Sequence, residues 1–244
     1  MEAIDTRDAL KVAAMRLFAE RGVEAVSVRD IILESGAKNG GSLNYYFGTK
    51  EGLIAELLRE IFEAASEHWL DGLSELLKKG GPASVREVVR IIAYAPPLLL
   101  RGEQYPTGAR FLASLLFTRR KFVAEQMRLM NLSVFNRLLA YVRELQPNIP
   151  DSVMGQRLVF VAWYMSAILS AREAAFSQSR GNSKLWTQAN ALGNLVDTAT
   201  ALIEAPVEDG LNNPDPAEQL RAPPRSTKKP AARASRRGRA ASVE

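Results

Sequence analysis

The chain has 244 residues, 47% of them hydrophobic and 24% charged, a composition ordinary for a folded globular protein. It has no cysteine and one histidine, His68, which excludes disulfide frameworks and the common cysteine and histidine metal sites, so we expect neither metal nor cofactor. Residues 221–244 carry eight basic residues and one acidic residue, a net charge of +7, so the first 220 residues carry −2 of the overall +5. Bulk charge therefore does not identify the body as a nucleic-acid binder.

The sequence shows no clear signal for secretion or membrane insertion. The segment Met1–Asp5 is acidic where a secretory signal has a basic and then an apolar run, so we expect a cytoplasmic protein. The longest uncharged apolar run, residues 158–171, has 14 residues. This is short of the roughly 18 needed to span a bilayer, so it predicts a buried helix and no membrane partner.

Apolar residues recur three and four apart up to about residue 204, which predicts an all-α protein. The first expected helix ends at Gly22. Ser27, with Asp30 three residues later, forms a short-acid version of a capping box and predicts a second, short helix that ends at Gly36. A polar, glycine-containing turn leads to a brief third helix over residues 42–47, with Ser42 expected as its N-cap.

The body contains longer helices. Thr49 is a candidate cap for a helix from Lys50 to about residue 79, and Ser84 and Glu87 predict a fifth helix that Pro96 ends. Four more helices are expected, over residues 107–118, 121–146, 151–179 and 184–204, which makes about nine in all. After residue 204 the chain turns to Pro, Asn, Gly and then Ala, Pro, Ser, Lys and Arg, so residues 205–244 are predicted to be disordered.

Catalytic motifs are absent from the sequence. It has no Gly-x-Ser-x-Gly elbow, no phosphate-binding loop and no dinucleotide fingerprint. His68 lies mid-helix beside Trp69, where a helix-surface or pocket-wall residue is the simpler interpretation. Glu56 and Glu60 lie on an amphipathic helix and are expected to face water. We therefore predict that the protein is not an enzyme.

The stretch from Thr6 to Leu58 places two short helices between longer ones. Two short helices at a fixed angle allow the second to enter a DNA major groove roughly 12 Å wide. Three motifs stand in this stretch: Leu17–Gly22 (LFAERG), Ser27–Ile31 (SVRDI) and Leu43–Ile54 (LNYYFGTKEGLI). Over about 50 residues the sequence resembles the tetracycline-repressor (TetR) family of bacterial transcriptional regulators.

The resemblance implies a three-helix helix-turn-helix DNA-binding head over residues 1–50 and a helical ligand-binding and dimerisation body over residues 51–204, followed by the basic tail. It implies three partners: double-stranded DNA, a small-molecule effector and a second copy of the chain. In this family the regulator usually represses transcription, and binding of the ligand relieves the repression. The alternatives are a helical small-molecule-binding protein with a vestigial head, and an enzyme whose catalytic group is not visible.

The resemblance also assigns roles in the head. Ser27, Ser42 and Lys50 would contact phosphates. Tyr45 and Tyr46, where the family usually has an aromatic residue and a histidine, would contact phosphates or support the helix. Base-reading candidates are Arg29, Lys38, Asn39, Gly41 and Asn44, because arginine pairs well with guanine and asparagine with adenine.

Two departures from the family pattern matter. The family commonly has tyrosine at Asn44, and the turn from Gly36 to Leu43 is one residue longer than its commonest form. The operator of a relative therefore cannot be assumed here. Gly40 and Gly41 either allow a close approach to DNA or simply form a loose loop. Asn44 could instead be an ordinary surface residue, and Arg29 could instead pair with a nearby acid.

The last two helices predict association. An apolar seam alternates four and three residues apart along the last helix, and small residues on the preceding helix permit close approach. We expect a symmetric four-helix interface between two subunits, with a buried hairpin in a monomer as the alternative. The predicted interface comprises Ala171, Ala175, Leu185, Ala189, Leu192, Val196, Ala199 and Ile203.

The middle helices supply candidates for a hydrophobic pocket with few polar anchors. Arg110 would neutralise a carboxylate or phosphate, or else lie at the surface. The expected effector is small and apolar, and the long helix from Lys50 is the expected transmitter between body and head. The pocket candidates, most of which also fit a plain core, are Arg110, Phe117, Met127, Met130, Phe160, Trp163 and Tyr164.

Truncation after residue 220 tests the basic tail. If the tail adds non-specific DNA affinity, its removal should flatten the dependence of log K on log salt concentration, by about 0.9 for each phosphate that the tail neutralises. Equal slopes for the full and truncated chains, measured by fluorescence anisotropy on one duplex, would leave the tail only a solubilising role.

Overall fold

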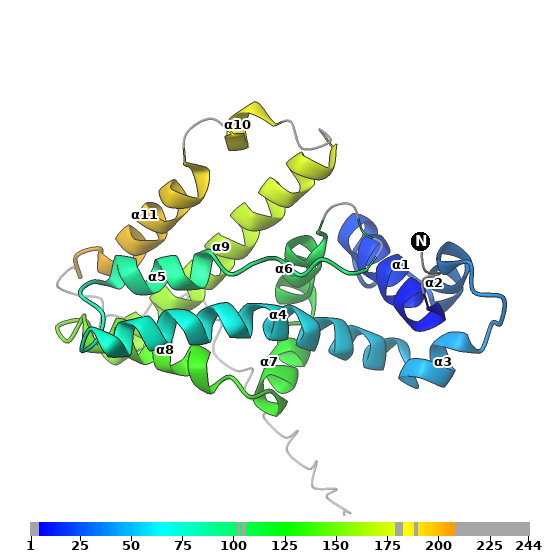
Figure 1. The fold of residues 1–244 in the computed structure, drawn as a ribbon, viewed down its shortest axis with the longest axis horizontal. Helices are drawn as coiled ribbons and strands as arrows, with labels where there is room; N and C mark the ends of the chain where they lie inside the picture. Colours follow the sequence, from blue (N-terminus) through cyan, green and yellow to red (C-terminus); the bar gives the residue numbers. More distant parts are fainter. Residues whose placement is uncertain (1–4, 102, 104–105, 179–182, 188–189, 208–244) are drawn as a thin grey trace, which may run out of the picture. The chain divides into compact units, whose positions relative to one another are not determined.

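A computed structural model describes residues 5–101, 103, 106–178, 183–187 and 190–207, and within these ranges every regular element is a helix (Figure 1). The predicted all-α class is confirmed. The predicted disordered tail from residue 208 onward and Ala189 lie outside the described residues. The helices are α1 (Thr6–Arg21), α2 (Val28–Ser35), α3 (Ser42–Phe47), α4 (Lys50–Lys78), α5 (Val85–Ala93), α6 (Gly108–Thr118), α7 (Arg120–Leu129), α8 (Ser133–Glu144), α9 (Asp151–Gln178), α10 (Lys184–Thr187) and α11 (Ala191–Glu204).

The described residues thus form eleven helices, where nine were predicted, because two predicted helices are each divided. Between α7 and α8 the backbone is extended at Met130, and the Asn131 side chain accepts a hydrogen bond from the Ser133 N–H at 3.3 Å. At the start of α11, Asn190 accepts from the Gly193 N–H at 2.8 Å. Asparagine side chains compete for backbone donors and so interrupt helices that periodicity alone would continue.

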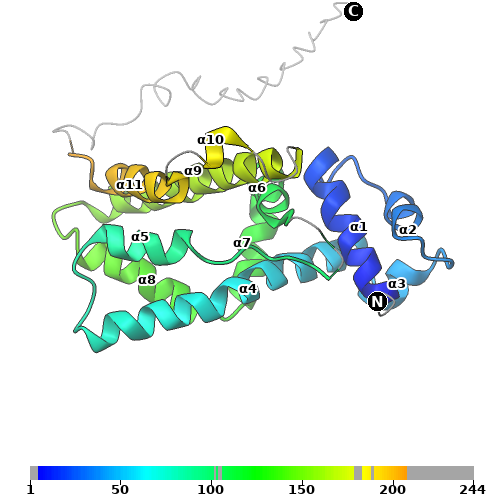
Figure 2. The ribbon, with the colours of Figure 1, turned by 45° about the horizontal axis from the view of Figure 1, so that its top comes forward.

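One core cluster joins the N-terminal helices to the body. It contains buried residues of α1, α2 and α3, the first half of α4, and Phe111 and Leu115 of α6. The rings of Phe18 and Phe111, both fully buried, stack with their centroids 5.7 Å apart. In Figure 2 the N-terminal helices lie at one end of α4, and the rest of α4 runs on among the body helices. Apolar burial therefore continues across the boundary expected near residue 50.

A second core cluster lies among the second half of α4 and helices α5, α8, α9 and α11. Trp69 of α4 packs against Phe135 of α8 with ring centroids 5.0 Å apart. Val196, Ala199 and Ile203 of α11 are buried in this same cluster. The prediction that these three form the dimer interface is therefore wrong, because their seam faces α5 and α9 of its own chain.

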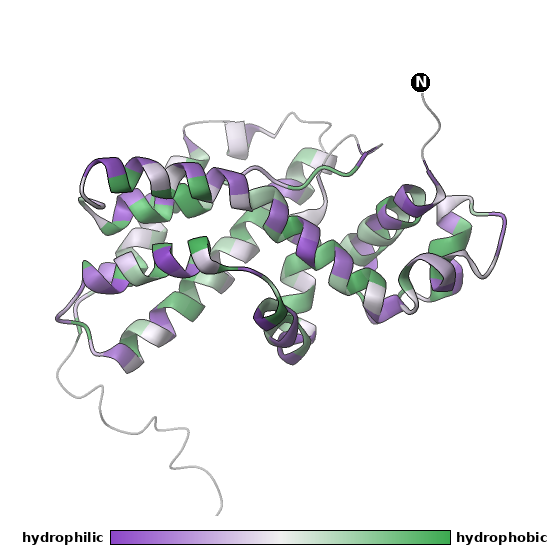
Figure 3. Ribbon diagram, turned by 60° about the horizontal axis from the view of Figure 1, so that its bottom comes forward, coloured by the Kyte–Doolittle hydropathy of each residue, from purple (hydrophilic) through white to green (hydrophobic). Residues whose placement is uncertain are grey.

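Helix α9 is apolar on two sides but buried on one. By length and composition alone, α9 is long and apolar enough to cross a membrane. In its most apolar stretch of 18 residues, 22% is buried inside the protein. Met154, Val161 and Met165 are buried, whereas Phe160 is 54% exposed. The expected buried helix is thus buried on one face only. Most other helices carry hydrophilic residues on their outer side (Figure 3).

Glu173 of α9 is a buried carboxylate, 7% exposed, at the N-terminus of α6. It accepts hydrogen bonds from the backbone N–H groups of Ala109 and Arg110, at 2.9 and 3.1 Å, and from Arg110 Nε at 3.2 Å. Burial raises the pKa of the Glu173 carboxyl, and these hydrogen bonds oppose that rise. Arg110 is therefore paired inside the protein, which corrects its predicted role as an effector anchor.

Candidate nucleic-acid interface

Helices α2 and α3 are set by local hydrogen bonds. The Ser27 hydroxyl accepts from the Asp30 N–H at 3.2 Å, and the Asp30 carboxylate accepts from the Ser27 N–H at 2.8 Å, which is the predicted capping box. These bonds from Ser27 also lower the pKa of Asp30. Gly36 ends α2 with φ at 69°, a left-handed conformation that favours glycine. The predicted start of α2 at Ser27 and its predicted end at Gly36 are both confirmed.

The turn before α3 differs from the expectation. Asn39 Oδ1 accepts from the Gly41 N–H at 2.9 Å, and Gly41, not Ser42, is the N-cap of α3. Ser42 is the first residue of the helix and is 9% exposed. The expected phosphate contact at Ser42 is therefore corrected, because its side chain packs inward.

The predicted base-reading residues are all on the surface of this unit: Arg29 on α2, Lys38, Asn39 and Gly41 in the turn, and Asn44 on α3. Within the described chain no acid lies at ion-pair distance from Arg29. Tyr45 is 82% exposed, while Tyr46 packs against the first core and meets Tyr45 edge to face at 4.9 Å. The polar groups and one aromatic ring are thus presented outward, and Tyr46 supports them.

Two expected phosphate contacts are used inside the head. Ser27 gives its hydroxyl and its backbone N–H to Asp30, so both of its donors are taken. Lys50 turns its ammonium to the carbonyl oxygens of Val23 and Val26, at 2.6 and 2.5 Å. Partial burial lowers the pKa of Lys50. The expectations for Ser27 and Lys50 are therefore corrected, because both residues hold the α1–α2 connection and the start of α4 in place.

The turn from α3 to α4 leaves no room for a side chain at one position. Thr49 is the N-cap of α4 and accepts from the Gly52 N–H at 3.0 Å, as predicted. A methyl group added at Gly52 would overlap the carbonyl oxygen of Phe47, which is backbone and cannot move aside alone. The motif that follows α3 thus fixes the angle between the third helix and the long helix.

Most basic residues of the head hold the fold. Arg7 pairs with Glu56, Lys11 with Asp8 and Glu60, and Arg16 with Glu34. The exposed basic residues that are in no ion pair within the described head are Arg21, Arg29 and Lys38. Sequence reasoning missed Arg21, at the end of α1, although it lies close enough to the start of α2 to lower the pKa of Asp30.

The head is tied to the body by Arg119, which follows α6. Its guanidinium donates to Glu24, in the α1–α2 connection, at 3.0 Å and to Glu51 of α4 at 3.3 Å. The bond to Arg119 lowers the pKa of Glu24. Together with the stacked Phe18 and Phe111 rings, this contact gives α6, as well as α4, a direct connection to the head.

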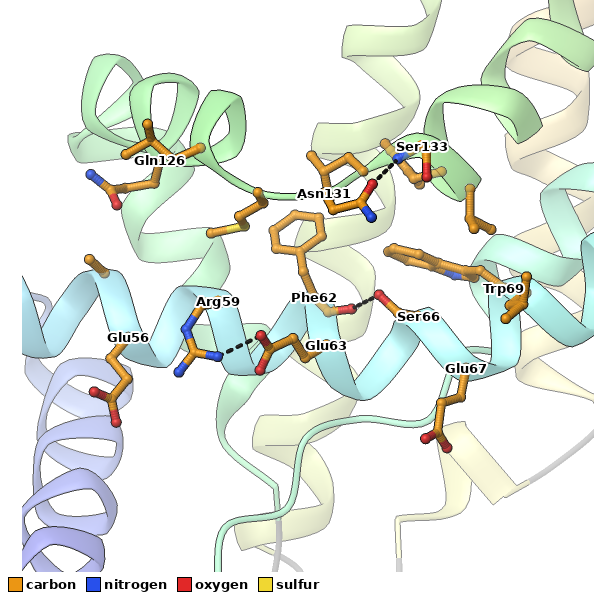
Figure 4. Close-up of a pocket in the computed structure, with 17 residues that line it drawn as sticks. Glu56, Arg59, Phe62, Glu63, Ser66, Glu67, Trp69, Gln126, Asn131 and Ser133 are labelled. Carbon is orange, nitrogen blue, oxygen red and sulfur yellow. Dashed lines mark hydrogen bonds and ion pairs between the residues drawn. The ribbon is translucent and has the colours of Figure 1, made fainter.

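The body contains two sizeable cavities. The larger, of about 710 Å³, lies between α4, α7 and the start of α8, with the rings of Phe62 and Trp69 facing the α7–α8 connection (Figure 4). The ion pair of Arg59 and Glu63 lies at its edge, and Trp69 Nε1 is buried there without a hydrogen-bond partner. The second cavity, of about 560 Å³, lies between α4, α5, α6, α9 and α11.

The predicted pocket residues do not gather in one place. Met130 lines the larger cavity, and Met127 packs against the first core. Phe117 is 63% exposed, and its ring meets Trp163 of α9, whose neighbour Phe160 is also exposed. The Tyr164 hydroxyl bonds with Thr198 at 2.7 Å. The prediction is therefore wrong for Phe117, Phe160, Trp163 and Tyr164, because none of them lines either of these two cavities and Tyr164 packs against the second core.

Two short helices joined by a turn, with polar groups exposed along them and a long helix behind, define a helix-turn-helix DNA-binding unit. The family model described as "Bacterial regulatory proteins, tetR family" matches residues 11–57. Residues 11–57 are therefore similar to tetR-family regulators, as the motifs indicate.

Two curated relatives are similar to parts of this chain. The HTH-type transcriptional repressor KstR2 of Mycolicibacterium smegmatis is 39% identical over 66 residues, 27% of this chain and 29% of the relative. The HTH-type transcriptional repressor Rv3405c of Mycobacterium tuberculosis is 37% identical over 105 residues, 41% of this chain and 48% of the relative. The matches span less than half the length of these relatives.

Among solved structures, the multidrug binding protein EbrR complexed with imidazole aligns at a TM-score of 0.36 and 19% identity, covering 84% of this chain and 98% of that chain. A putative transcriptional regulator from Rhodococcus sp. RHA1 also has a TM-score of 0.36, with 21% identity, covering 83% of this chain and 97% of that chain.

Replacing Gly52 by alanine tests the geometry of the head. We expect Gly52→Ala to destabilise the protein by about 1–3 kcal/mol, because the new methyl group forces the backbone of Phe47 to move. Urea denaturation measures the change. Gly155→Ala in α9 is the matched control, because nothing lies within 4 Å of the added atom, and it should be neutral or slightly stabilising. Equal stability of both variants would contradict the close approach.

Proposed function

We propose that this protein is a homodimeric transcriptional repressor that a small apolar effector releases from a palindromic operator. It would act on DNA in the bacterial cytoplasm. The observation that carries this proposal is the exposed set of Arg29, Lys38, Asn39 and Asn44 on a helix-turn-helix unit in which Arg7, Lys11 and Arg16 are internally paired. The match of this unit to tetR-family regulators supports the same function.

Base reading is assigned to the outward side chains. Asn44 on α3 and Asn39 before it suit adenine, and Arg29 on α2 suits guanine. Gly41 and Lys38 lie in the turn, where backbone and ammonium can approach the DNA closely. Tyr45 contacts the phosphate backbone, and Arg21 adds a phosphate contact at the end of α1.

Dimerisation is assigned to the outer side of α9, with α11 and α10 beside it. Phe117 and Phe160 are exposed there, as are Ala171, Leu185 (74%) and Leu202 (41%). The partly exposed Ala175 and Leu192 lie on the same helices. A helix that is apolar on two sides and covered on one needs a second partner, and a two-fold copy supplies a matching surface.

The effector is assigned to the body and acts by preferring one arrangement of the two heads over another. Two helices connect the body with the head. Helix α4 runs through both core clusters, and α6 reaches the head through Phe111 and Arg119. A ligand that shifts either helix changes the separation of the heads and so the fit to two half-sites.

Selection of bound sequences from a random duplex pool by the full chain tests this function. A palindrome with half-site centres about 34–36 Å apart, or a multiple of that, is expected. Asn44→Ala and Arg29→Ala should each cost about 1–3 kcal/mol at one position of each half-site, whereas the exposed Lys121→Ala on α7 should change nothing. If no sequence is enriched while ligands still bind, the protein is instead a small-molecule binder with a vestigial head.

Sedimentation tests the association surface. The wild-type chain is expected to sediment as a dimer, and Phe160→Glu as a monomer, because the charge would be buried without a partner. Leu129→Glu is the control: Leu129 is an equally apolar, more exposed residue on α7, away from the proposed interface. A monomeric wild type, or two variants that behave alike, would contradict this surface.

A further inference from the structure

The cavity between α4, α5, α6, α9 and α11 has a strongly apolar wall. Its volume is about 560 Å³. Apolar side chains from all five helices line it, together with Pro96, Pro97 and Pro106. Such a cavity suits an aliphatic or aromatic ligand body. The residues that give this character include Ile61, Ile92, Leu112, Leu169, Phe176 and Leu192.

Two charged side chains line this cavity, Arg172 and Glu173, neighbours on α9. The carboxylate of Glu173 already accepts hydrogen bonds from two backbone N–H groups of α6 and from Arg110. Arg172 has no comparable partner among the described residues. Its Nε is buried without a hydrogen-bond partner, and among the described residues no acid lies at ion-pair distance from it.

Phe176, one turn further along α9, orients the Arg172 side chain. The guanidinium lies over the Phe176 ring, 4.7 Å from its centroid. The Phe176 ring therefore covers part of the guanidinium, and Arg172 as a whole is half-buried. A half-buried cation next to apolar surface is stabilised when an anion or a strong acceptor joins it. The cavity thus has an apolar body and one uncompensated positive group.

We propose that the effector of this protein is an apolar carboxylate whose carboxyl group pairs with Arg172 and whose hydrocarbon part fills the cavity between α4, α5, α6, α9 and α11. The assignment rests on the proposed function as a ligand-responsive regulator and names the chemical class of the ligand. A carboxylate matches the planar donors of a guanidinium with charge-assisted hydrogen bonds. Arg172 would thus neutralise the acidic group of the ligand, which is the role expected of Arg110 from the sequence.

The position of this cavity connects its occupant with the head. Gly108 and Ala109, the first residues of α6, form part of the wall. Glu173, next to Arg172, holds that same end of α6 through the Ala109 and Arg110 N–H groups. The far end of α6 is followed by Arg119, which is bonded to the head. A ligand that pulls Arg172 and its neighbour therefore acts on one end of a helix whose other end touches the DNA-binding unit.

Isothermal titration calorimetry with the full chain, in the absence of DNA, tests the proposal. The probes are straight-chain fatty acids from hexanoate to hexadecanoate, each compared with its own methyl ester, which has the same chain but no charge. We expect at least one acid to bind about tenfold or more tightly than its ester. Arg172→Gln should remove that preference, and Arg172→Lys should keep part of it. Arg59→Gln, an arginine at the edge of the other cavity, should leave it unchanged.

The proposal is overturned if no acid binds more tightly than its ester to the wild-type chain, a comparison that requires no variant to fold. It is also overturned if Arg172→Gln folds, as judged by circular dichroism, and retains the preference. Failure of the regulatory function is seen separately, because enrichment of a DNA sequence by the ligand-free protein does not depend on the acid. Release of that DNA by the preferred acid, and not by its ester, joins the two results.

Discussion

The contact of α1 with α6 is the constraint on which the arrangement of this protein depends. Phe18 and Phe111 are fully buried against each other, in a cluster that also takes in the first half of α4. A helix-turn-helix unit of this size has too little apolar surface to be very stable alone. Here the body completes its core, so the orientation of the reading helix is set by helices that also line the cavities. In the function that we propose, this packing would link ligand binding to DNA binding.

Most charged side chains of the head likewise stabilise its packing. Arg7, Lys11 and Arg16 hold α1 against α4 and α2, and Lys50 closes the α1–α2 connection. Few positive groups are left to attract phosphate, so a single head would bind DNA weakly. In the function that we propose, specific binding would depend on exposed side chains that discriminate bases and on a second subunit that places another head one helical turn away.

Local signals in the sequence predicted much of the head. The capping box at Ser27, the glycine at Gly36 and the cap at Thr49 act within a few residues, and the structure shows each where the sequence places it. Exposure of the base-reading candidates followed from the same helix boundaries. What the sequence could not show is which distant group each side chain meets: Lys50 finds two carbonyls, and Arg110 finds Glu173.

Periodicity had a similar limit in the body. The seam of Val196, Ala199 and Ile203 marks a buried face correctly, but a repeat does not say whether its partner is the same chain or another. The breaks before α8 and α11 depend on single hydrogen bonds that Asn131 and Asn190 accept from nearby backbone N–H groups, which apolar periodicity does not register. The charged pair in the second cavity had a sequence signal, since Arg172 and Glu173 are the only charged residues between Leu158 and Gln178.

The ion pairs of Arg119 with Glu24 and Glu51 have a consequence for how ionic strength acts on this protein. Both glutamates are more than half exposed, so dissolved ions screen these pairs. Raising the salt concentration then loosens the junction between α6 and the head as well as weakening attraction to the DNA backbone. The response of operator affinity to salt thus contains a part that originates inside each subunit, and counting phosphate contacts from that response alone would overestimate them.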